Sequence, residues 1–264
     1  MTALRTAAGL EPVGLAELVE RAALQTRVDR KYLVPHGTAE QVLAGLAGAA
    51  RVLEIGGQRD FGYGSLYFDT PELTSYHLAA RGRRRRFKVR RRSYLDTGQV
   101  YLEVKTRGSR GSTVKERTPD EDSPALGLDP ERCRFVDDVL GRSGIDAVAG
   151  RLQPVLGTRY QRTTLLLPAS DSRVTVDTDL AWAVPGGPVL DLAGTAVVET
   201  KSSSTPSAAD RWLWRHGHRP SRVSKYGTGL AALHQHLPAN RWHPVLSRHV
   251  DLHPTDTPQE RTAS

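Results

Sequence analysis

The sequence predicts an α+β protein built on an antiparallel β-barrel, with a polar tunnel inside it and helices flanking it. Three observations indicate this fold class. Many segments have strand character, several of them alternate charged and apolar residues with a period of two, and few show the continuous apolar runs of a parallel sheet. Closing such strands into a barrel directs their charged faces toward one axis.

The elements can be assigned in order along the chain. Apolar residues at helical spacing predict a helix at about 14–25, and a strand is expected at 27–34. Thr38 and Gln41 form a capping-box pattern, which predicts a second helix that continues to Ala49. Further strands are expected at about 61–69, 84–95, 99–107, 112–118, 154–167, 173–181, 188–193 and 195–202. Further helices are expected near 72–80, 131–148, 207–216 and 222–236.

A single folded domain is expected over residues 14–237. Residues 1–13 and 238–264 are rich in Pro, Thr, Ser, Ala and charged residues and show no periodicity. Segments of this composition rarely bury enough apolar surface to become ordered, so both are expected to be mobile tails.

Positive charge is the most informative feature of the composition. The chain has 37 Lys+Arg and 29 Asp+Glu residues and a formal charge of +8, which is typical of a protein with an anionic partner. A genomic preference for arginine would produce the same excess. Lysine is rare, which indicates that a compact ammonium group is needed where lysine is retained. The six lysines are Lys31, Lys88, Lys105, Lys115, Lys201 and Lys225.

Other classes of protein are excluded by what the sequence lacks. Cys133 is the only cysteine, which excludes an internal disulfide and a cysteine-based zinc site. No run approaches the roughly 20 apolar residues of a membrane helix, and no signal-peptide core is present, so a soluble cytoplasmic protein is expected. Aromatic residues make up 6% of the chain, without a stacking or groove motif, so no specific nucleic-acid partner is expected. There is no Walker A loop, so any ATP is bound without a P-loop.

The segment 81–92 is the most basic part of the chain. Alternation predicts one strand face that carries Lys88, Arg90 and Arg92. Arg91 falls on the other face, where we expect it to be exposed. We interpret Arg81–Arg84 as an exposed loop and the strand as a surface that faces an anion. A solvated basic run or a nonspecific nucleic-acid patch is the alternative.

Two strands repeat a Glu-x-Lys pattern on one face, at Glu103 with Lys105 and at Glu199 with Lys201. An ordinary salt bridge explains one such pair. Two pairs beside an arginine-rich strand favour a site for metal and phosphate, because carboxylate oxygens bind Mg²⁺ or Mn²⁺ and ammonium groups bind phosphate oxygens.

Further polar residues extend this pattern. Lys115 and Arg117 share one face of the next strand. Asp177 and Asp179 also share a face; they could be metal ligands, but we favour a solvated strand face. Basic residues in the segment Ser221–Gly229, at the start of a helix, could close the mouth of a phosphate site.

Nine short motifs occur in order along the chain: VDRKYLV (28–34), LYFDT (66–70), RRFKVRRRSY (85–94), YLEVKTR (101–107), VKER (114–117), YQR (160–162), VDTDL (176–180), VVETKS (197–202) and SKYGTG (224–229). Together they resemble the VTC domain, the polyphosphate-polymerase domain of the vacuolar transporter chaperone proteins, which has soluble bacterial relatives. That domain is part of the triphosphate tunnel metalloenzyme (CYTH-like) superfamily. The resemblance extends from about residue 26 to residue 235. Each motif alone is unspecific, but nine in the order of the family are specific.

The resemblance implies an antiparallel barrel lined by Lys and Arg that holds a triphosphate with Mn²⁺ or Mg²⁺. It assigns the metal to Glu199, and the Glu-x-Lys pattern makes Glu103 a second candidate ligand. The residues expected to act in catalysis are Arg90, Arg92, Lys105 and Lys225. The residues expected to bind phosphate are Lys31, Lys88, Lys115, Arg117, Arg162, Lys201 and Arg222.

One departure from the sequence pattern of the wider superfamily narrows the expected type of protein. The segment 28–31 has a single carboxylate where that superfamily has a Glu-x-Glu-x-Lys opening. This fits a VTC-like protein better than a thiamine-triphosphatase or a class IV cyclase. Arg222 stands where relatives usually have lysine, which keeps the charge and changes its geometry.

The leading functional hypothesis is an enzyme that transfers the γ-phosphate of ATP, or of another nucleoside triphosphate, to inorganic polyphosphate. A tripolyphosphatase or nucleoside triphosphatase of the same fold would transfer it to water. A non-catalytic subunit that binds polyphosphate or a nucleotide is the third alternative. Inorganic polyphosphate or tripolyphosphate is the expected ligand, and a separate membrane protein is a candidate partner. A generic nucleic-acid binder is the weakest hypothesis.

Overall fold

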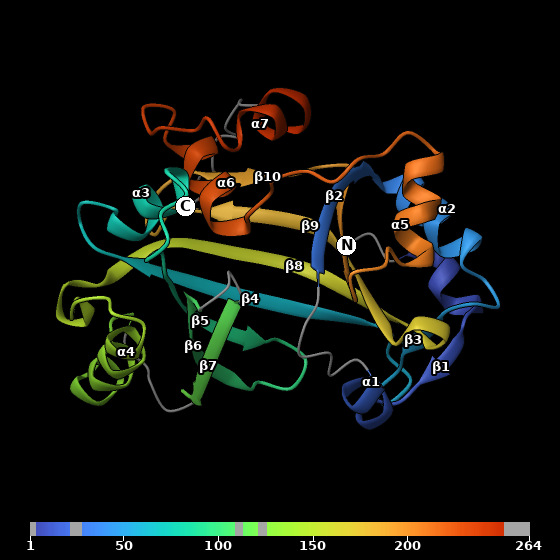
Figure 1. Cartoon of the computed structure of the whole chain (residues 1–264), viewed down its shortest axis with the longest axis horizontal. Helices are drawn as coiled ribbons and strands as arrows, with labels where there is room; N and C mark the ends of the chain where they lie inside the picture. Colours follow the sequence, from blue (N-terminus) through green and yellow to red (C-terminus); the bar gives the residue numbers. More distant parts are fainter. Residues whose placement is uncertain (1–3, 22–27, 109–112, 121–125, 251–264) are drawn as a thin grey trace, which may run out of the picture.

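Figure 1 shows the computed structural model, in which helices surround one large sheet. It describes residues 4–21, 28–108, 113–120 and 126–250. The strands are β1 (Glu11–Val13), β2 (Val28–Pro35), β3 (Arg51–Leu53), β4 (Asp60–Asp69), β5 (Lys88–Tyr94), β6 (Val100–Arg107), β7 (Thr113–Pro119), β8 (Gln153–Leu167), β9 (Ser172–Ala183), β10 (Val189–Asp191) and β11 (Thr195–Ser202). The helices are α1 (Leu15–Arg21), α2 (His36–Gly45), α3 (Thr74–Ala80), α4 (Pro130–Arg142), α5 (Ala208–Arg215), α6 (Lys225–Leu233) and α7 (His243–His249). Short 3₁₀ segments are η1 (Arg5–Gly9), η3 (Ala149–Arg151) and η4 (Pro168–Ser170).

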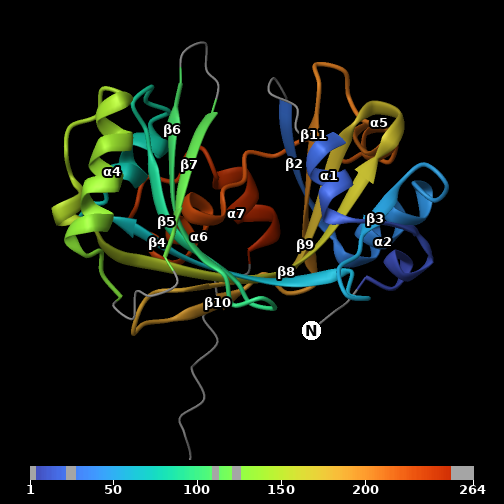
Figure 2. The ribbon, with the colours of Figure 1, turned by 90° about the horizontal axis from the view of Figure 1, so that it is seen from below.

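Eight strands form a continuous path in the order β2-β11-β9-β8-β4-β5-β6-β7, and each neighbouring pair along it is antiparallel. The sheet curls so that β6 and β7 form one wall, β2 and β11 form the opposite wall, and β4, β8 and β9 lie between them (Figure 2). Within the described residues, the two end strands are not paired with each other. The predicted α+β fold, an antiparallel sheet curled like a barrel with flanking helices, is confirmed. Among the described residues the barrel is not closed by hydrogen bonds between β2 and β7.

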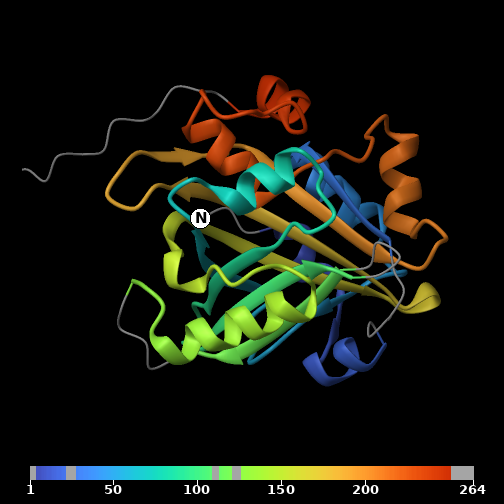
Figure 3. The ribbon, with the colours of Figure 1, turned by 60° about the vertical axis from the view of Figure 1, so that its left-hand side comes forward.

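Helices cover the outer sides of both walls. α4 lies along the outside of the β5–β7 wall (Figure 3), where Val136, Val139 and Leu140 are buried against the sheet. α2 and α5 pack on the outer side of the β2–β11 wall. None of the described helices is long and apolar enough to cross a membrane. The outer faces of the strands are therefore apolar cores, which leaves the inner face for the charged residues.

α6 occupies part of the space between the walls, and two glycines allow it to pack closely there (Figure 2). A Cβ atom at Gly229 would lie 2.2 Å from Cδ1 of Trp182, and one at Gly227 would lie 2.2 Å from Cζ2 of Trp242. Trp182 is fully buried, and its Nε1–H donates to the carbonyl oxygen of Lys225 at 2.7 Å. Close packing therefore explains the Gly-Thr-Gly sequence and places the start of α6 at the inner face.

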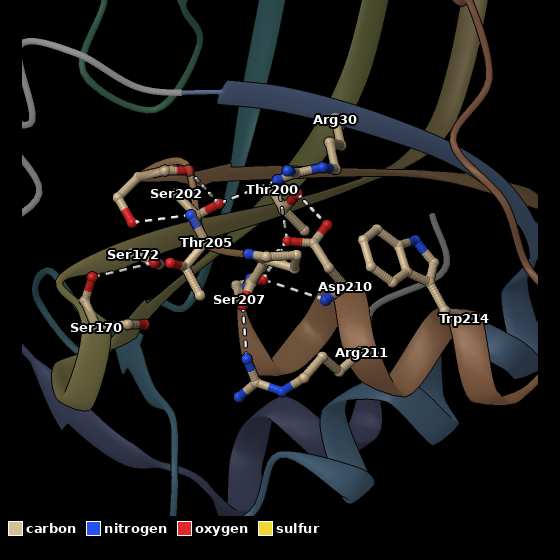
Figure 4. Close-up of polar contacts among 12 residues, drawn as sticks. Arg30, Ser170, Ser172, Thr200, Ser202, Thr205, Ser207, Asp210, Arg211 and Trp214 are labelled. Atoms are coloured by element: carbon tan, nitrogen blue, oxygen red, sulfur yellow. Dashed lines mark hydrogen bonds and ion pairs between the residues drawn. The ribbon is translucent and has the colours of Figure 1, made fainter.

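A buried carboxylate joins α5 to the outer face of the β2–β11 wall (Figure 4). Asp210 accepts hydrogen bonds from the hydroxyls of Tyr32 at 2.7 Å and Thr200 at 2.6 Å, and it lies 3.5 Å from Arg30. It also accepts hydrogen bonds from Ser207, the N-cap residue of α5. These residues alternate along their strands with charged residues of the inner face, so the network fixes the position of that wall.

Both segments that were expected to be tails are partly folded. The stretch 4–13 forms η1 and β1, and the stretch 238–250 contains α7. Their buried apolar side chains are Leu4, Ala7, Leu10, Val13, Trp242, Val245 and Leu246. These residues are too sparse for a periodic signal, and tertiary contacts hold them in place. The folded part therefore extends beyond 14–237 at both ends; residues 1–3 and 251–264 lie outside the described residues.

Several helix boundaries also differ from the prediction. α2 ends at Gly45 rather than at Ala49, and α6 is shorter at both ends than the predicted 222–236. α2 begins at His36 directly after Pro35, whose φ of −53° already suits a helix start, so Thr38 lies inside the first turn and forms no capping box. α4 ends at Arg142 rather than near residue 148, because the chain turns at Gly144, whose φ is +65°.

Arg91 lies on the outer face as predicted, but it is buried there. Its Nε donates to Asp120 at 2.5 Å, and 11% of its side chain is exposed. Asp120 is fully buried and also accepts from Arg132 of α4 at 3.0 Å. The expected exposure is wrong because α4 covers this face of the wall.

Replacing Arg91 with alanine should lower the free energy of unfolding by about 1–3 kcal/mol, because a buried carboxylate loses a charge-assisted partner. Urea denaturation measures this change. Arg84→Ala, in the exposed loop before β5, is the matched control and should change the free energy by less than about 0.5 kcal/mol. Equal stability of the two variants would contradict the buried ion pair.

Candidate phosphate-binding site

The register of the β5–β6–β7 wall arranges its polar residues in rows across the inner face. One row contains Lys88, Lys105 and Lys115, the next contains Arg90, Glu103 and Arg117, and a third contains Arg92 and Tyr101. Because side chains alternate between the faces of a strand, all of these rows face the same way. Six cations of this wall that were expected to contact phosphate therefore lie beside one another, four on β5 and β6 and two on the edge strand β7.

Glu103 balances part of this charge. It is 1% exposed; its Oε2 accepts from Nε and Nη2 of Arg90 at 2.8 and 2.6 Å, and its Oε1 accepts from Lys115 at 3.1 Å. Burial alone would raise the pKa of the Glu103 carboxyl, but Arg90 and Arg92 hold it well below its usual range. Both oxygens contact cations, so this geometry suits a counterion better than the metal ligand that the sequence suggested.

A second carboxylate lies on the part of the sheet between the two walls, which is formed by β4, β8 and β9 and is called the floor below. Asp177 of β9 is opposite Arg162 of β8 and accepts two hydrogen bonds from it, at 2.6 and 2.8 Å. The ammonium group of Lys225, in the first turn of α6, contacts the same carboxylate. Burial would raise the pKa of Asp177, but Arg162 and Lys225 lower it to about 2.

The sequence interpretation of Asp177 as a solvated residue is therefore wrong. It was paired with Asp179, but a bulge between Arg159 and Gln161 interrupts the alternation, and Asp179 has a φ of +52°. Asp177 is fully buried, whereas Asp179 is exposed. The bulge separates two carboxylates that a regular strand would have kept on one face.

The third carboxylate, Glu199, lies on the opposite wall. In the register of β11 it is flanked by Lys31 of β2 and Thr175 of β9, and its Oε1 is 3.3 Å from Lys201. Burial would raise the pKa of Glu199, but Lys31 and Lys201 hold it well below its usual range, and Arg162 on the floor contributes.

Three consecutive residues at the start of α6 connect the helix to three strands. Ser224, the N-cap residue, accepts a hydrogen bond from Lys88 of β5 at 2.8 Å. Lys225 contacts the carboxylate on β9 described above. The Tyr226 hydroxyl donates to Asp69, a fully buried residue at the end of β4. The start of α6 is therefore part of the site and is held from several directions.

Tyr160 of β8 contacts three cations of the inner face, which come from β5, β8 and α6. The Arg92 guanidinium donates to the Tyr160 hydroxyl at 3.0 Å, and the Lys225 ammonium lies 4.2 Å from the centre of the Tyr160 ring. The Arg162 guanidinium is 5.2 Å from the same ring. The hydrogen bond orients Arg92, and the two cation–π contacts attract Lys225 and Arg162 to the ring.

Cations from both walls influence the same lysines. Burial, Lys31 and Arg90 lower the pKa of Lys88 to about 7. Arg90 and burial lower the pKa of Lys105 well below its usual value, and Lys31 contributes there too. Lys31 is on β2 and the two affected lysines are on β5 and β6, so the walls face each other across one space. An anion in that space would relieve this repulsion.

Comparison of the sequence with known protein families is consistent with this basic inner face. The family model of the VTC domain matches residues 26–234. The chain belongs to the VTC domain family. No curated protein matched it.

Several solved structures are similar to this VTC domain. One is a putative adenylyl cyclase from Hippeastrum, described as having a dominant triphosphatase activity, with a TM-score of 0.48 and 16% identity over 78% of this chain and 96% of that chain. A putative adenylate cyclase from Bacillus halodurans has a TM-score of 0.41 and 12% identity over 90% and 98% of the two chains. Another from Vibrio parahaemolyticus has a TM-score of 0.38 and 15% identity over 84% and 98%.

The residues around Glu199 fit a divalent metal that binds together with phosphate. Among the described residues, no group of three or more His, Cys, Asp or Glu side chains could hold a metal ion alone. Opposite Glu199, however, Oγ1 of Thr175 is buried without a hydrogen-bond partner. Mg²⁺ is commonly held by one or two carboxylates and completed by phosphate oxygens and water. Glu199 and Thr175 offer hard oxygen atoms for Mg²⁺ or Mn²⁺ in such a site.

Sequence reasoning placed most site residues on the inner face and misplaced one. Arg222 is exposed in the segment before α6, and among the described residues it has no hydrogen bond or ion pair. Sequence reasoning also missed buried hydroxyls: Ser65 and Thr158 lie in register with Arg92, and their Oγ atoms and the Arg92 Nε all lack partners. Short polar residues in strands carry no signal of their own, so only the register reveals them.

Binding of tripolyphosphate should be accompanied by proton uptake near neutral pH. Below pH 7 Lys88 is already charged; above pH 7 the anion must restore its proton, so this residue makes affinity fall as pH rises. Calorimetry at pH 6 and pH 8, in buffers of different ionisation enthalpy, measures the uptake.

Lys88→Arg is the control, because arginine stays charged throughout this range. It should reduce proton uptake at pH 8 and leave uptake at pH 6 nearly unchanged. Identical uptake by the two proteins at pH 8 would contradict a lowered pKa at Lys88.

Proposed function

We propose that this VTC domain transfers the terminal phosphoryl group of ATP, or of another nucleoside triphosphate, to the end of an inorganic polyphosphate chain. The observation that carries the proposal is that the carboxylates of the inner face are paired with cations. Glu103, Asp177 and Glu199 each contact a cation, and each has a lowered pKa. They therefore act as counterions and are poor proton acceptors at neutral pH.

This charge state favours a phosphate acceptor over water. Attack by water requires a group that removes a proton, and an efficient base has a pKa near the working pH. A terminal phosphate oxygen of polyphosphate is already anionic and needs no base. In the transfer, a bond forms between that oxygen and the γ-phosphorus, the β–γ bridging P–O bond breaks, and the nucleoside diphosphate leaves with the bonding electrons.

The cations of the inner face would supply the catalytic stabilisation. Phosphoryl transfer depends mainly on positioning and on neutralising charge at the transferred group. Arg90, Arg92 and Lys105 come from one wall, while Arg162 and Lys225 come from the floor and α6, so the phosphates would be contacted from several sides. The carboxylates that pair with Arg90 and Arg162 hold these guanidinium groups in place for the substrate.

The other basic residues would hold the phosphates that do not react. Lys31 and Lys201 flank Glu199, and Lys88 is positioned by Ser224. A divalent metal bound at Glu199 would neutralise phosphate charge and polarise the phosphoryl oxygens. Lys31 and Lys201 belong to the β2–β11 wall and Lys88 belongs to the β5–β7 wall, so the triphosphate would span from one wall to the other.

The product profile after incubation with ATP and Mn²⁺ tests the proposal. We expect long polyphosphate chains and nucleoside diphosphate in the wild-type reaction. Orthophosphate as the only phosphate product would replace the proposal with a hydrolase, and binding without turnover would replace it with a non-catalytic phosphate-binding role.

Glu199→Gln keeps the volume of the side chain and removes its negative charge. Turnover should therefore fall by orders of magnitude at saturating Mn²⁺ while the protein stays folded. Glu20→Gln, an exposed position in α1, is the control and should keep wild-type turnover. Full activity of a folded Glu199→Gln protein would contradict the role of this carboxylate.

A further inference from the structure

Two arginines outside the site described above extend the basic surface of the β5–β6 wall, and a third joins them from another segment. Lys88 and Lys105 lie opposite each other in register. Arg107, two residues after Lys105 in β6, lies beyond this row on the same inner face, about 7 Å further along the strand. Arg86 lies two residues before Lys88, in the segment that leads into β5, and its charge acts on that of Lys88. This is the end of the wall at which β5 begins and β6 ends.

Arg241 reaches the same place from a different segment, the connection between α6 and α7. The neighbouring Trp242 is 4% exposed and packs in the core, which anchors this segment. A Cβ atom at Gly82 would lie 2.4 Å from Nη1 of Arg241, and Gly82 has a φ of +66°. The glycine in the loop before β5 therefore makes room for the guanidinium group. Arg86, Arg107 and Arg241 are called the rim arginines below.

The rim arginines are gathered without a counterion. All three are half-buried, and among the described residues none forms an ion pair with a carboxylate. Burial, Arg107 and Arg241 together lower the pKa of Arg86, so the charges of the other two rim arginines act on it. Arg90 and Arg162, by contrast, each have a carboxylate partner. Three cations held together in this way are unfavourable unless an anion binds them.

We infer that the rim arginines form a second anion-binding subsite, which holds the part of a phosphate chain that extends beyond the triphosphate enclosed between the walls. The inference rests on the proposed function and deepens it. The basic side chains run without interruption from Arg90 through Lys88 and Lys105 to the rim, so one linear polyanion can contact all of them. The preferred ligand is then an oligophosphate longer than three units.

A flexible inorganic chain fits this surface better than nucleic acid. Single-stranded nucleic acid is held by aromatic side chains on which bases stack, in addition to basic groups. The exposed large hydrophobic residues of the described chain are all aliphatic. The rim therefore offers charge and hydrogen-bond donors without a platform for bases.

The test compares ligands of two lengths. Affinities for tripolyphosphate and for a polyphosphate of a few tens of units are measured by calorimetry with the wild type and with the double variant Arg86→Gln/Arg107→Gln. The double variant should lose roughly tenfold or more in affinity for the long chain, because charge-assisted contacts are lost. Its affinity for tripolyphosphate should change less than about twofold.

Arg84→Gln removes the same charge from the exposed part of the same loop and should leave both affinities unchanged. An unchanged affinity of the double variant for the long chain, or equal losses for both ligands, would overturn the rim subsite. Single-stranded DNA that binds as tightly as the long polyphosphate, and depends on the same two arginines, would also overturn it. Failure of the wild type to bind tripolyphosphate would instead refute the proposed function, so the two failures are distinguishable.

Discussion

The repulsion among cations on one concave surface is the constraint on which the structure depends. Curling the sheet brings basic residues from both walls and from the floor toward a common space. Glu103, Asp177 and Glu199 each neutralise part of this charge, on one wall, on the floor and on the other wall. The remaining cations exceed these carboxylates in number. Burial and the neighbouring cations therefore lower the pKa values of Lys88 and Lys105. A multiply charged anion is the ligand that this excess suits best.

The wall positions are fixed from the outside, by contacts that leave the inner face free for ligand. Asp120 joins Arg91 of β5 to Arg132 of α4, and Asp210 joins α5 to β2 and β11. The outer faces of the walls therefore supply stability, and the inner face carries the charge except where α6 packs against it. This division lets closely spaced cations be held by a rigid scaffold, since the energy that opposes their repulsion comes from the apolar cores behind them.

Local alternation was enough to predict most of the inner face, because the period of two is a property of a single strand. Partners across strands were harder to predict. Strands β8 and β9 form a hairpin around the turn at residues 168–171, and extending its register from that turn would have placed Arg162 opposite Asp177. The bulge at Asp179 has no sequence signal, and beyond it the side chains of β9 point to the opposite faces of the sheet. The position of α6 depends on Trp182, which lies far away in the sequence, and the folded ends depend on scattered apolar residues. Such long-range contacts are set by the whole fold.

Thermal unfolding with different anions tests most directly whether the inner face is an enclosed oligophosphate site. Tripolyphosphate at about 100 times its dissociation constant should stabilise the protein by roughly 2.7 kcal/mol through mass action. The shift in Tm should persist at moderate salt, because an enclosed anion is partly shielded from screening, and it should be small with orthophosphate or single-stranded DNA. A shift produced only by DNA and abolished by salt would contradict the account and identify the inner face as a general basic surface.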